Sequence, residues 1–244
     1  MAVSVVAYPV NQGAAPSLSQ APASSNILTR LRVETRGEHD AVERVLDLMS
    51  AALTVGAYRN RLAQFYGFYR PLEAALQVRC ALPEDCLAPG TLQLATLLPR
   101  LNKTALLRQD LHFLGVLTDA LPLCRRLPTI DTEAEALGCL YVMEGATLGG
   151  RMITQHVRAT FGITPTTGGS FFDGYAGDTG RMWQAMRHVL VRCANDTQTE
   201  DAIVANAIVA NAIATFACLR AWCDPANTCG HNETLIYTEA NQRA

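Results

Sequence analysis

The feature that most constrains the fold is an apolar stretch, residues 137–157, that contains four glycines. It reads LGCLYVMEGATLGGRMITQHV and has the length and apolar periodicity of a buried helix. Each glycine inside a helix costs about 1 kcal/mol relative to alanine, so the four together require a compensating role. On a 3.6-residue period Tyr141, Gly145 and Gly149 fall in line, with Gly150 beside them. One face of this helix therefore lacks side chains.

Two interpretations of this bare face follow from the residues alone. Glycine lets the backbones of neighbouring helices approach closely, so the pattern is typical of small-residue helix–helix packing. The pattern equally leaves room for a flat ligand to contact the helix backbone directly. The spacing is compatible with both interpretations, and a second feature is needed to favour one of them.

Helical periodicity dominates from residue 26 onward, and no convincing strand alternation interrupts it. Nothing between the ends resembles a linker, and the length allows one large domain. We predict an all-α protein with a single helical domain, residues 27–223, between flexible tails at 1–26 and 224–244. The expected helices are residues 26–50, 55–80, 103–118, 132–161, 179–193 and 198–223, with a short piece at 90–98 and a loop at 162–177.

The charge and apolar patterns argue against several classes of protein. With a net charge of −2 and a pI near 6.2, the chain lacks the basic footprint of a nucleic-acid-binding protein. We find no apolar run near the roughly 20 residues that a membrane helix needs. Residues 1–26 also lack the basic and apolar regions of a secretion signal. We therefore expect a cytoplasmic protein that binds neither nucleic acid nor membrane.

Eight cysteines in a chain without a secretion signal are expected to be reduced thiols rather than a disulfide framework. A C-terminal run of Cys218, Cys223, Cys229 and His231 raises the alternative of a zinc site. Its spacing matches no common zinc motif. The role of this run is left open.

The helix expected over residues 26–50 carries a histidine on its apolar stripe. Leu31, His39, Val42 and Leu46 recur at helical spacing and predict an inward-facing side. A histidine in such a position is commonly a core residue with satisfied polar atoms, and the alternative is a ligand. A buried imidazole on one helix and a bare glycine face on another would suit a planar iron macrocycle bound between them.

Three segments of the sequence resemble the biliverdin-producing haem (heme) oxygenases. They are LYVMEGATLGGR in the glycine-rich stretch, TR-x2-H ending at His39, and FFDGYAGDTGRMWQAMRHVL. The resemblance is to the bacterial branch associated with bacteriophytochromes and covers residues 28–222. It implies a haem-oxygenase-like helical bundle in which a kinked, glycine-rich helix lies over the distal side of haem.

This resemblance implies roles for individual residues. His39 would be the iron ligand on the proximal side, with Glu43 beside its ring. Gly145 and Gly149 would lie over the distal side as part of the catalytic site. Phe216 would help to wall the haem pocket.

In this family, basic and tyrosine side chains meet the haem propionates at the open edge of the pocket. The expected counterparts here are Arg32, Tyr141 and Arg187. One position departs from the mammalian pattern, in which an aspartate follows the first glycine and holds distal water, because this chain has Ala146 there. Distal water would then be ordered by backbone groups or by other polar side chains, such as those at residues 151 and 155.

The reaction implied by the resemblance is oxidative cleavage of haem to biliverdin, carbon monoxide and ferrous iron, using O2 and external electrons. Haem b would be both substrate and cofactor. No GxGxxG fingerprint is present, so no bound flavin or nicotinamide is expected, and a separate ferredoxin or reductase would supply electrons. A bacteriophytochrome is a possible recipient of the biliverdin.

Two alternatives to this enzyme remain open. A haem carrier or sensor on the same helical fold would use the same residues without turnover. A helical interaction protein would use the glycines for packing alone.

Overall fold

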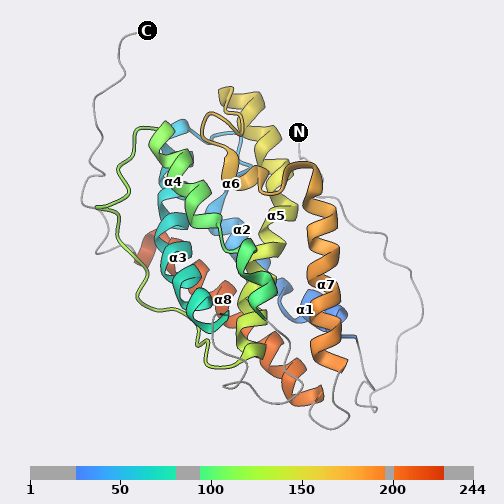
Figure 1. Ribbon diagram of the computed structural model, residues 1–244. Coiled ribbons are helices and arrows are strands. Elements are labelled where there is room, and N and C mark those ends of the chain that lie inside the picture. Colours follow the sequence, from blue (N-terminus) through green and yellow to red (C-terminus); the bar gives the residue numbers. More distant parts are fainter. Residues whose placement is uncertain (1–25, 81–93, 196–200, 228–244) are drawn as a thin grey trace, which may run out of the picture.

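The computed structural model describes residues 26–80, 94–195 and 201–227, and this part of the chain is helical without a strand (Figure 1). The prediction of an all-α fold is confirmed. The expected tails, residues 1–26 and 224–244, lie almost entirely outside the described residues. The elements are α1 (Ile27–Glu34), α2 (Arg36–Leu46), α3 (Val55–Cys80), η2 (Leu94–Arg100), α4 (Lys103–Phe113), α5 (Glu133–Phe161), α6 (Ser170–Asp173), η3 (Ala176–Asp178), α7 (Thr179–Asn195), α8 (Asp201–Cys223) and η4 (Pro225–Asn227).

The glycine-rich helix α5 runs through the middle of the bundle. It packs most extensively against α8, and also against α6 and α7 (Figure 1). Its start is fixed by a capping box, in which Thr132 Oγ1 accepts from the Glu135 N–H at 3.2 Å and Glu135 Oε2 accepts from the Thr132 N–H at 2.9 Å. It ends where Gly162 adopts the left-handed φ of +70°. The expected helix over 132–161 is confirmed, and it is continuous through its glycines.

The first expected helix, residues 26–50, differs from the structure in two ways. It is divided at Thr35, whose hydroxyl donates to the Leu31 carbonyl at 2.6 Å and whose backbone, with φ of −88° and ψ of −9°, departs from the ideal values of an α-helix. A threonine that bonds back to the preceding turn commonly bends a helix. The second helix then ends at Leu46 rather than near residue 50, because Asp47 takes a left-handed conformation with φ of +47°.

The helix expected over 55–80 is confirmed as α3, which carries Pro71 without ending there. The helix expected over 103–118 ends earlier, at Phe113, because the chain turns at Gly115 with φ of +75°. Of the short piece expected at 90–98, residues 94–98 fall in η2 and the remainder lies outside the described residues.

The loop expected over 162–177 contains α6, which is fastened to α4 by a buried carboxylate. Asp110 accepts hydrogen bonds from the Ser170 N–H and hydroxyl and from the Phe171 N–H, each at 2.8 Å. Burial raises the pKa of Asp110, and these three hydrogen bonds oppose the rise. Tyr58 on α3 adds a hydrogen bond from its hydroxyl to the Gly168 carbonyl at 3.0 Å. The two phenylalanines of α6 are thereby held against α5.

The last long helix, α8, is more apolar than the sequence analysis allowed. Ala202–Cys223 has a mean hydropathy of 2.0 and is long and apolar enough to cross a membrane by length and composition, contrary to the expectation of no such run. Its position explains the composition, because α8 is the main packing partner of α5 and Asn211 donates to the Thr129 carbonyl at 3.0 Å. A core helix of a globular bundle passes the same test.

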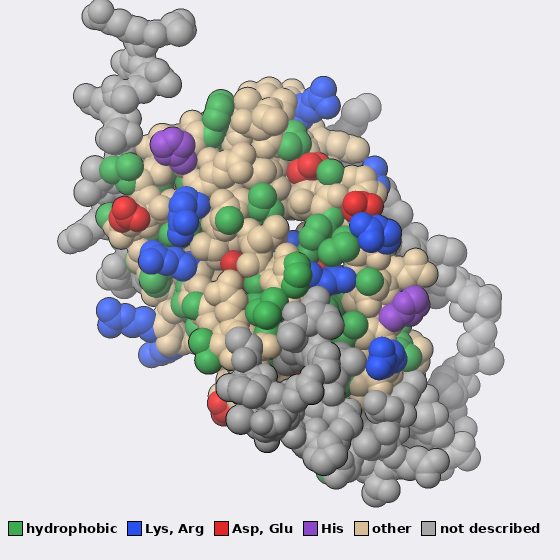
Figure 2. Space-filling view, in the orientation of Figure 1, with side chains coloured by type: hydrophobic (Ala, Val, Ile, Leu, Met, Phe, Trp, Pro, Cys, Tyr) green, Lys and Arg blue, Asp and Glu red, His purple; other side chains and the backbone are tan. Residues whose placement is uncertain are grey.

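Charged side chains of both signs are interspersed with apolar ones on the face of the molecule seen in Figure 2.

Candidate active site

Two of the glycines in α5 serve close packing. A Cβ added at Gly138 would lie 2.6 Å from the Ile208 carbonyl oxygen of α8. A Cβ at Gly150 would collide with the Phe172 carbonyl of α6. Both neighbours are backbone atoms that cannot move aside cheaply. For these two positions, the interpretation as small-residue packing is correct.

The other two glycines face space. A Cβ at Gly145 would meet nothing closer than the Trp183 ring at 3.9 Å, and a Cβ at Gly149 would meet nothing within 4 Å. The absence of a side chain at these positions is therefore not required by the packing of the described residues. Together with Tyr141 they form the stripe that we call the glycine face of α5.

His39 lies on α2, and neither of its ring nitrogens makes a hydrogen bond among the described residues. Its side chain is 51 % exposed, which contradicts the expectation of a buried imidazole. The reason is that Phe216 of α8 covers only one side of the ring, edge-on, with the ring centroids 5.5 Å apart. Asp40 lies 3.7 Å from Nδ1 and Glu43 lies 3.9 Å from Nε2, and both separations exceed hydrogen-bonding distance. Either nitrogen can therefore turn to a ligand while a carboxylate remains near the other.

The α1–α2 pair approaches α5 at Thr35 and Tyr141. Burial raises the pKa of Tyr141, and a hydrogen bond with Thr35 and the charge of Arg32 oppose the rise, which places this phenol at the α1–α2 junction. His39 follows Thr35 by one helical turn, and Gly145 follows Tyr141 by one turn. In Figure 1 the α1–α2 pair and α5 ascend the bundle in the same direction. The α1–α2 pair and α5 both pack against α8 but make few direct contacts with each other.

Of the residues expected to bind the haem propionates, Arg32 and Tyr141 lie near each other, whereas Arg187 lies on another helix, α7. The Tyr141 ring lies 5.7 Å from the ring of Trp183 on α7, and Arg32 is close enough to Tyr141 to affect its pKa. Arg187 is exposed on α7, one turn after Trp183. Trp183 was not singled out by the sequence analysis, although it lies in the GRMW segment that carried part of the resemblance.

The heme oxygenase family model matches residues 25–222. The chain belongs to the haem oxygenase family. It is an enzyme that degrades haem to biliverdin, with haem as both substrate and prosthetic group and with O2 and an electron donor as co-reactants. Among solved structures, the NO- and CO-bound haem oxygenase of Neisseria meningitidis is similar in fold, with a TM-score of 0.60 and 18 % identity over 82 % of this chain and 91 % of that one. No curated protein sequence matches the chain.

The residues of this haem oxygenase fit a haem group. Gly145 and Gly149 offer backbone without side chains on α5, and α2 offers an imidazole whose nitrogens make no hydrogen bond among the described residues. Aromatic side chains of Phe216 and Trp183 stand at the sides, which suits the apolar macrocycle.

No acid occupies the distal position, and the polar side chains expected to replace it are unequally placed. Ala146 is exposed beside the glycine face. Arg151 follows Gly149 by two residues, which by the helical period of about 100° per residue turns it to the opposite side of α5. Gln155 is exposed about one turn beyond the last glycine of the helix. We therefore do not extend the role of distal water ligand to Arg151.

A buried group of charges, which was not predicted from the sequence, lies on another side of α5; we call it the charge network. Glu144, 2 % exposed, accepts from Arg100 at 2.7 Å through Oε2 and from the Tyr175 hydroxyl at 2.8 Å through Oε1. Lys103 Nζ lies 3.6 Å from Glu144 Oε1 and 4.0 Å from the centroid of the Tyr175 ring. Glu144 stands inside an apolar run, which was the one available signal, but its partners come from three other segments.

Proposed function

We propose that haem binds between α2 and the glycine face of α5, with His39 as its iron ligand. The observation that carries this proposal is the contrast within α5: Gly138 and Gly150 are packed against backbone, whereas Gly145 and Gly149 face space. They follow Tyr141 by one and two turns, and Tyr141 is hydrogen-bonded to Thr35, which directly precedes the helix that carries His39. A helix under packing constraints alone would have no reason to keep the second pair, since each glycine costs about 1 kcal/mol relative to alanine.

When bound, haem supplies an iron centre that takes up and activates O2 after external electrons reduce it. His39 holds the iron through one ring nitrogen, and the carboxylate of Glu43 or Asp40 accepts a hydrogen bond from the other, which fixes the tautomer and the ring orientation. The backbone at Gly145 and Gly149 lets the macrocycle approach α5 closely. This closeness would restrict the space over the distal face of the macrocycle.

The positive and phenolic groups near the pocket orient the substrate. Arg32, Tyr141 and Arg187 bind the haem propionates through charge-assisted hydrogen bonds. Phe216 covers the flank of the proximal ligand. These contacts determine the rotation of the ring and hence which of its carbon bridges faces the distal space.

Residues 27–223 form one cytoplasmic haem-binding domain between tails. Haem b is the bound group, a separate ferredoxin or reductase is the electron donor, and no flavin or nicotinamide is bound. A bacteriophytochrome receives the biliverdin.

Titration of the purified protein with ferric haem, followed by O2 and a ferredoxin–reductase system, tests this function. The Soret band should form at one equivalent and then give way to the absorption of a bile pigment. A carrier or sensor would keep its Soret band under the same conditions, and a packing protein would not bind haem stoichiometrically.

His39→Ala tests the ligand assignment. The histidine-ligated spectrum and turnover should both be lost, whereas His188→Ala, at an exposed position on α7, should leave both unchanged. An intact histidine-ligated spectrum in the His39 variant would refute the assignment.

A further inference from the structure

Lys103 is the only lysine in the chain, and it is buried. Its side chain is 1 % exposed, and its Nζ has no hydrogen-bond partner among the described residues. Charge compensation comes from Glu144 Oε1 at 3.6 Å, which is beyond hydrogen-bonding distance. A buried ammonium group with unmade hydrogen bonds is costly unless water satisfies it.

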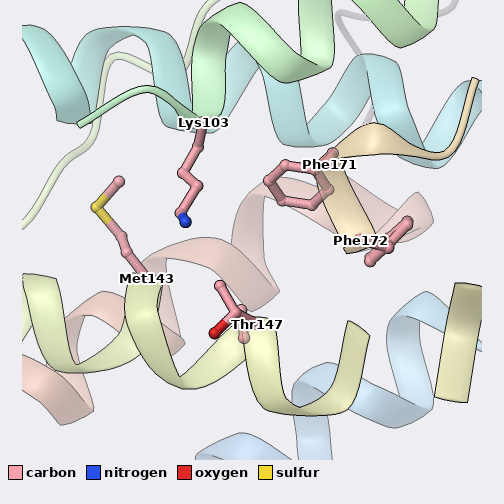
Figure 3. A pocket seen from close by; sticks show the side chains of 6 residues that line it. Lys103, Met143, Thr147, Phe171 and Phe172 are labelled. Atoms are coloured by element: carbon pink, nitrogen blue, oxygen red, sulfur yellow. The ribbon is translucent and has the colours of Figure 1, made fainter. Parts of the chain in front are cut away.

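Nζ points into a small cavity between α4, α5 and α6 (Figure 3). The cavity measures about 10 Å³, which is room for one water molecule. Thr147 supplies a second polar group, because its hydroxyl donates to the Glu144 carbonyl at 2.6 Å and keeps lone pairs free to accept. The other lining residues are Met143, Ala146, Phe171 and Phe172.

Ala146 connects this cavity with the glycine face. It lines the cavity and is itself exposed directly after Gly145. A methyl group is the smallest side chain that could stand there, so a water at this place is separated from the distal space by little protein. The charge network therefore adjoins Ala146, the position at which the chain lacks a distal acid.

We propose that Lys103 Nζ and Thr147 Oγ1 hold a water molecule in this cavity, and that this water orders the hydrogen bonds that reach the distal face of haem past Ala146. The ammonium donates to the water oxygen, so both water hydrogens point away from Lys103. One goes to Thr147 Oγ1 and the other towards the rim at Ala146. Lys103 is thus a positioning residue that orients a donor towards the distal face and keeps its own proton.

This inference rests on the proposed haem site and gives the buried lysine a function there. The charged and titratable groups around Lys103 come from every neighbouring element: Glu73 on α3, Arg100 in η2, Glu144 on α5 and Tyr175 before η3. Burial lowers the pKa of Lys103, and the two glutamates oppose the fall.

The test uses the acid–alkaline transition of the ferric haem complex, followed by absorption spectroscopy. A donor aimed at the distal face favours the alkaline form, so its removal should raise the midpoint. Thr147→Val should raise it by about 0.5–1 pH unit, the equivalent of one hydrogen bond, and Thr147→Ser should restore it. Thr154→Val, which removes another hydroxyl from α5 away from the cavity, should leave it unchanged.

Lys103→Met provides the second variant and should shift the midpoint in the same direction as Thr147→Val. Because Lys103 is the single lysine, protein labelled with 15N-lysine gives one Nζ signal, which in the wild type should be that of an ammonium protected from exchange with bulk solvent. A midpoint that is equal in the valine and serine variants, or a freely exchanging Nζ, would overturn the inference. Failure to bind haem at all would instead overturn the proposed function.

Discussion

Two sides of α5 differ in what they present: one has open space at its glycines, and the other carries buried charges. On the glycine face, Gly145 and Gly149 carry no side chain, and a Cβ added at Gly149 would meet no atom within 4 Å. Another side, on which Glu144 lies, buries Arg100, Lys103 and Glu144 together, with less than a tenth of any of their side chains exposed. One helix thus carries a surface made for contact with a ligand and a surface made of compensated charges.

The contrast shows how the same helix can be rigid and accessible. Gly138 and Gly150 let α8 and α6 approach closely enough to hold α5 in place. The charge network adds links from η2 and from the N-terminus of α4. Because these contacts fix its position, α5 can present bare backbone at Gly145 and Gly149 without losing order. Variants that exchange the two kinds of surface test this interpretation.

The largest effect is expected from Glu144→Gln. Removal of this charge takes the carboxylate partner from the buried Arg100 and leaves Lys103 with Glu73 alone, and breaking a buried pair from one side costs about 3–5 kcal/mol. Urea unfolding of the haem-free protein measures the loss. Glu34→Gln breaks the exposed pair with Arg30, which lies on α1 at 2.8 Å, and should cost less than about 1 kcal/mol. Equal losses in the two variants would show that the charge network is not a structural element.

A smaller loss is expected from Gly150→Ala. The new Cβ collides with the Phe172 carbonyl, and overpacking against backbone costs about 1–3 kcal/mol. Because Phe172 also lines the cavity beside Lys103, the variant should disturb that cavity as well. Thermal unfolding checks the prediction, and a variant as stable as the wild type would mean that α6 is not held against α5 at this point.

The sequence predicted the glycine face of α5 better than the charge network. Helical periodicity located α3 and α5 closely, and the spacing of Tyr141, Gly145 and Gly149 identified the bare face. Such features depend on residues close together in the chain. The charge network depends on residues 100, 103, 144 and 175, which only the tertiary fold brings together. A usable signal existed, since a single lysine among 20 basic residues is an unusual choice.

Local interactions with distant consequences explain the other differences. The break at Thr35 arises from one side-chain hydrogen bond to Leu31, which periodicity does not register. The exposure of His39 depends on what α8 places beside it, and Phe216 covers only one edge. The expectation of a buried imidazole failed for that reason, because the apolar stripe of α2 continues on either side of a position that packing leaves uncovered.

The stability of the protein should also fall at alkaline pH, because α5 buries a thiol where it packs against α8. Cys139 is buried against α8, and burial raises the pKa of its thiol to about 11, although Thr215 and Asn211 oppose the rise. Between pH 9 and 11 the unfolded chain loses this proton and the folded protein keeps it, so stability falls as pH rises. The contribution is about 3 kcal/mol, from 1.36 kcal/mol for each of about two pKa units.

Cys139→Ala isolates this contribution. The variant should lose less stability than the wild type between pH 8 and 11, as measured by urea unfolding at each pH. Cys193→Ala, at a half-buried position on α7, is the matched control and should follow the wild-type slope. Identical slopes for the wild type and Cys139→Ala would show that this thiol ionises as freely in the folded protein as in the unfolded chain.

The smallest effect on stability is expected from Gly149→Ala, which also tests most directly whether the glycine face is kept bare for a ligand. A Cβ there meets nothing within 4 Å, so the haem-free protein should gain up to about 1 kcal/mol from helix propensity. Gly37→Ala on α2, which is equally unobstructed, should give a similar gain without affecting haem. In contrast, the methyl group at 149 occupies the space proposed for the macrocycle and should weaken haem binding at least tenfold in a titration, the equivalent of about 1.4 kcal/mol. Gain of stability with loss of affinity is the signature of a position kept bare for a ligand. A Gly149 variant that binds haem as tightly as the wild type would leave the bare face without its proposed purpose.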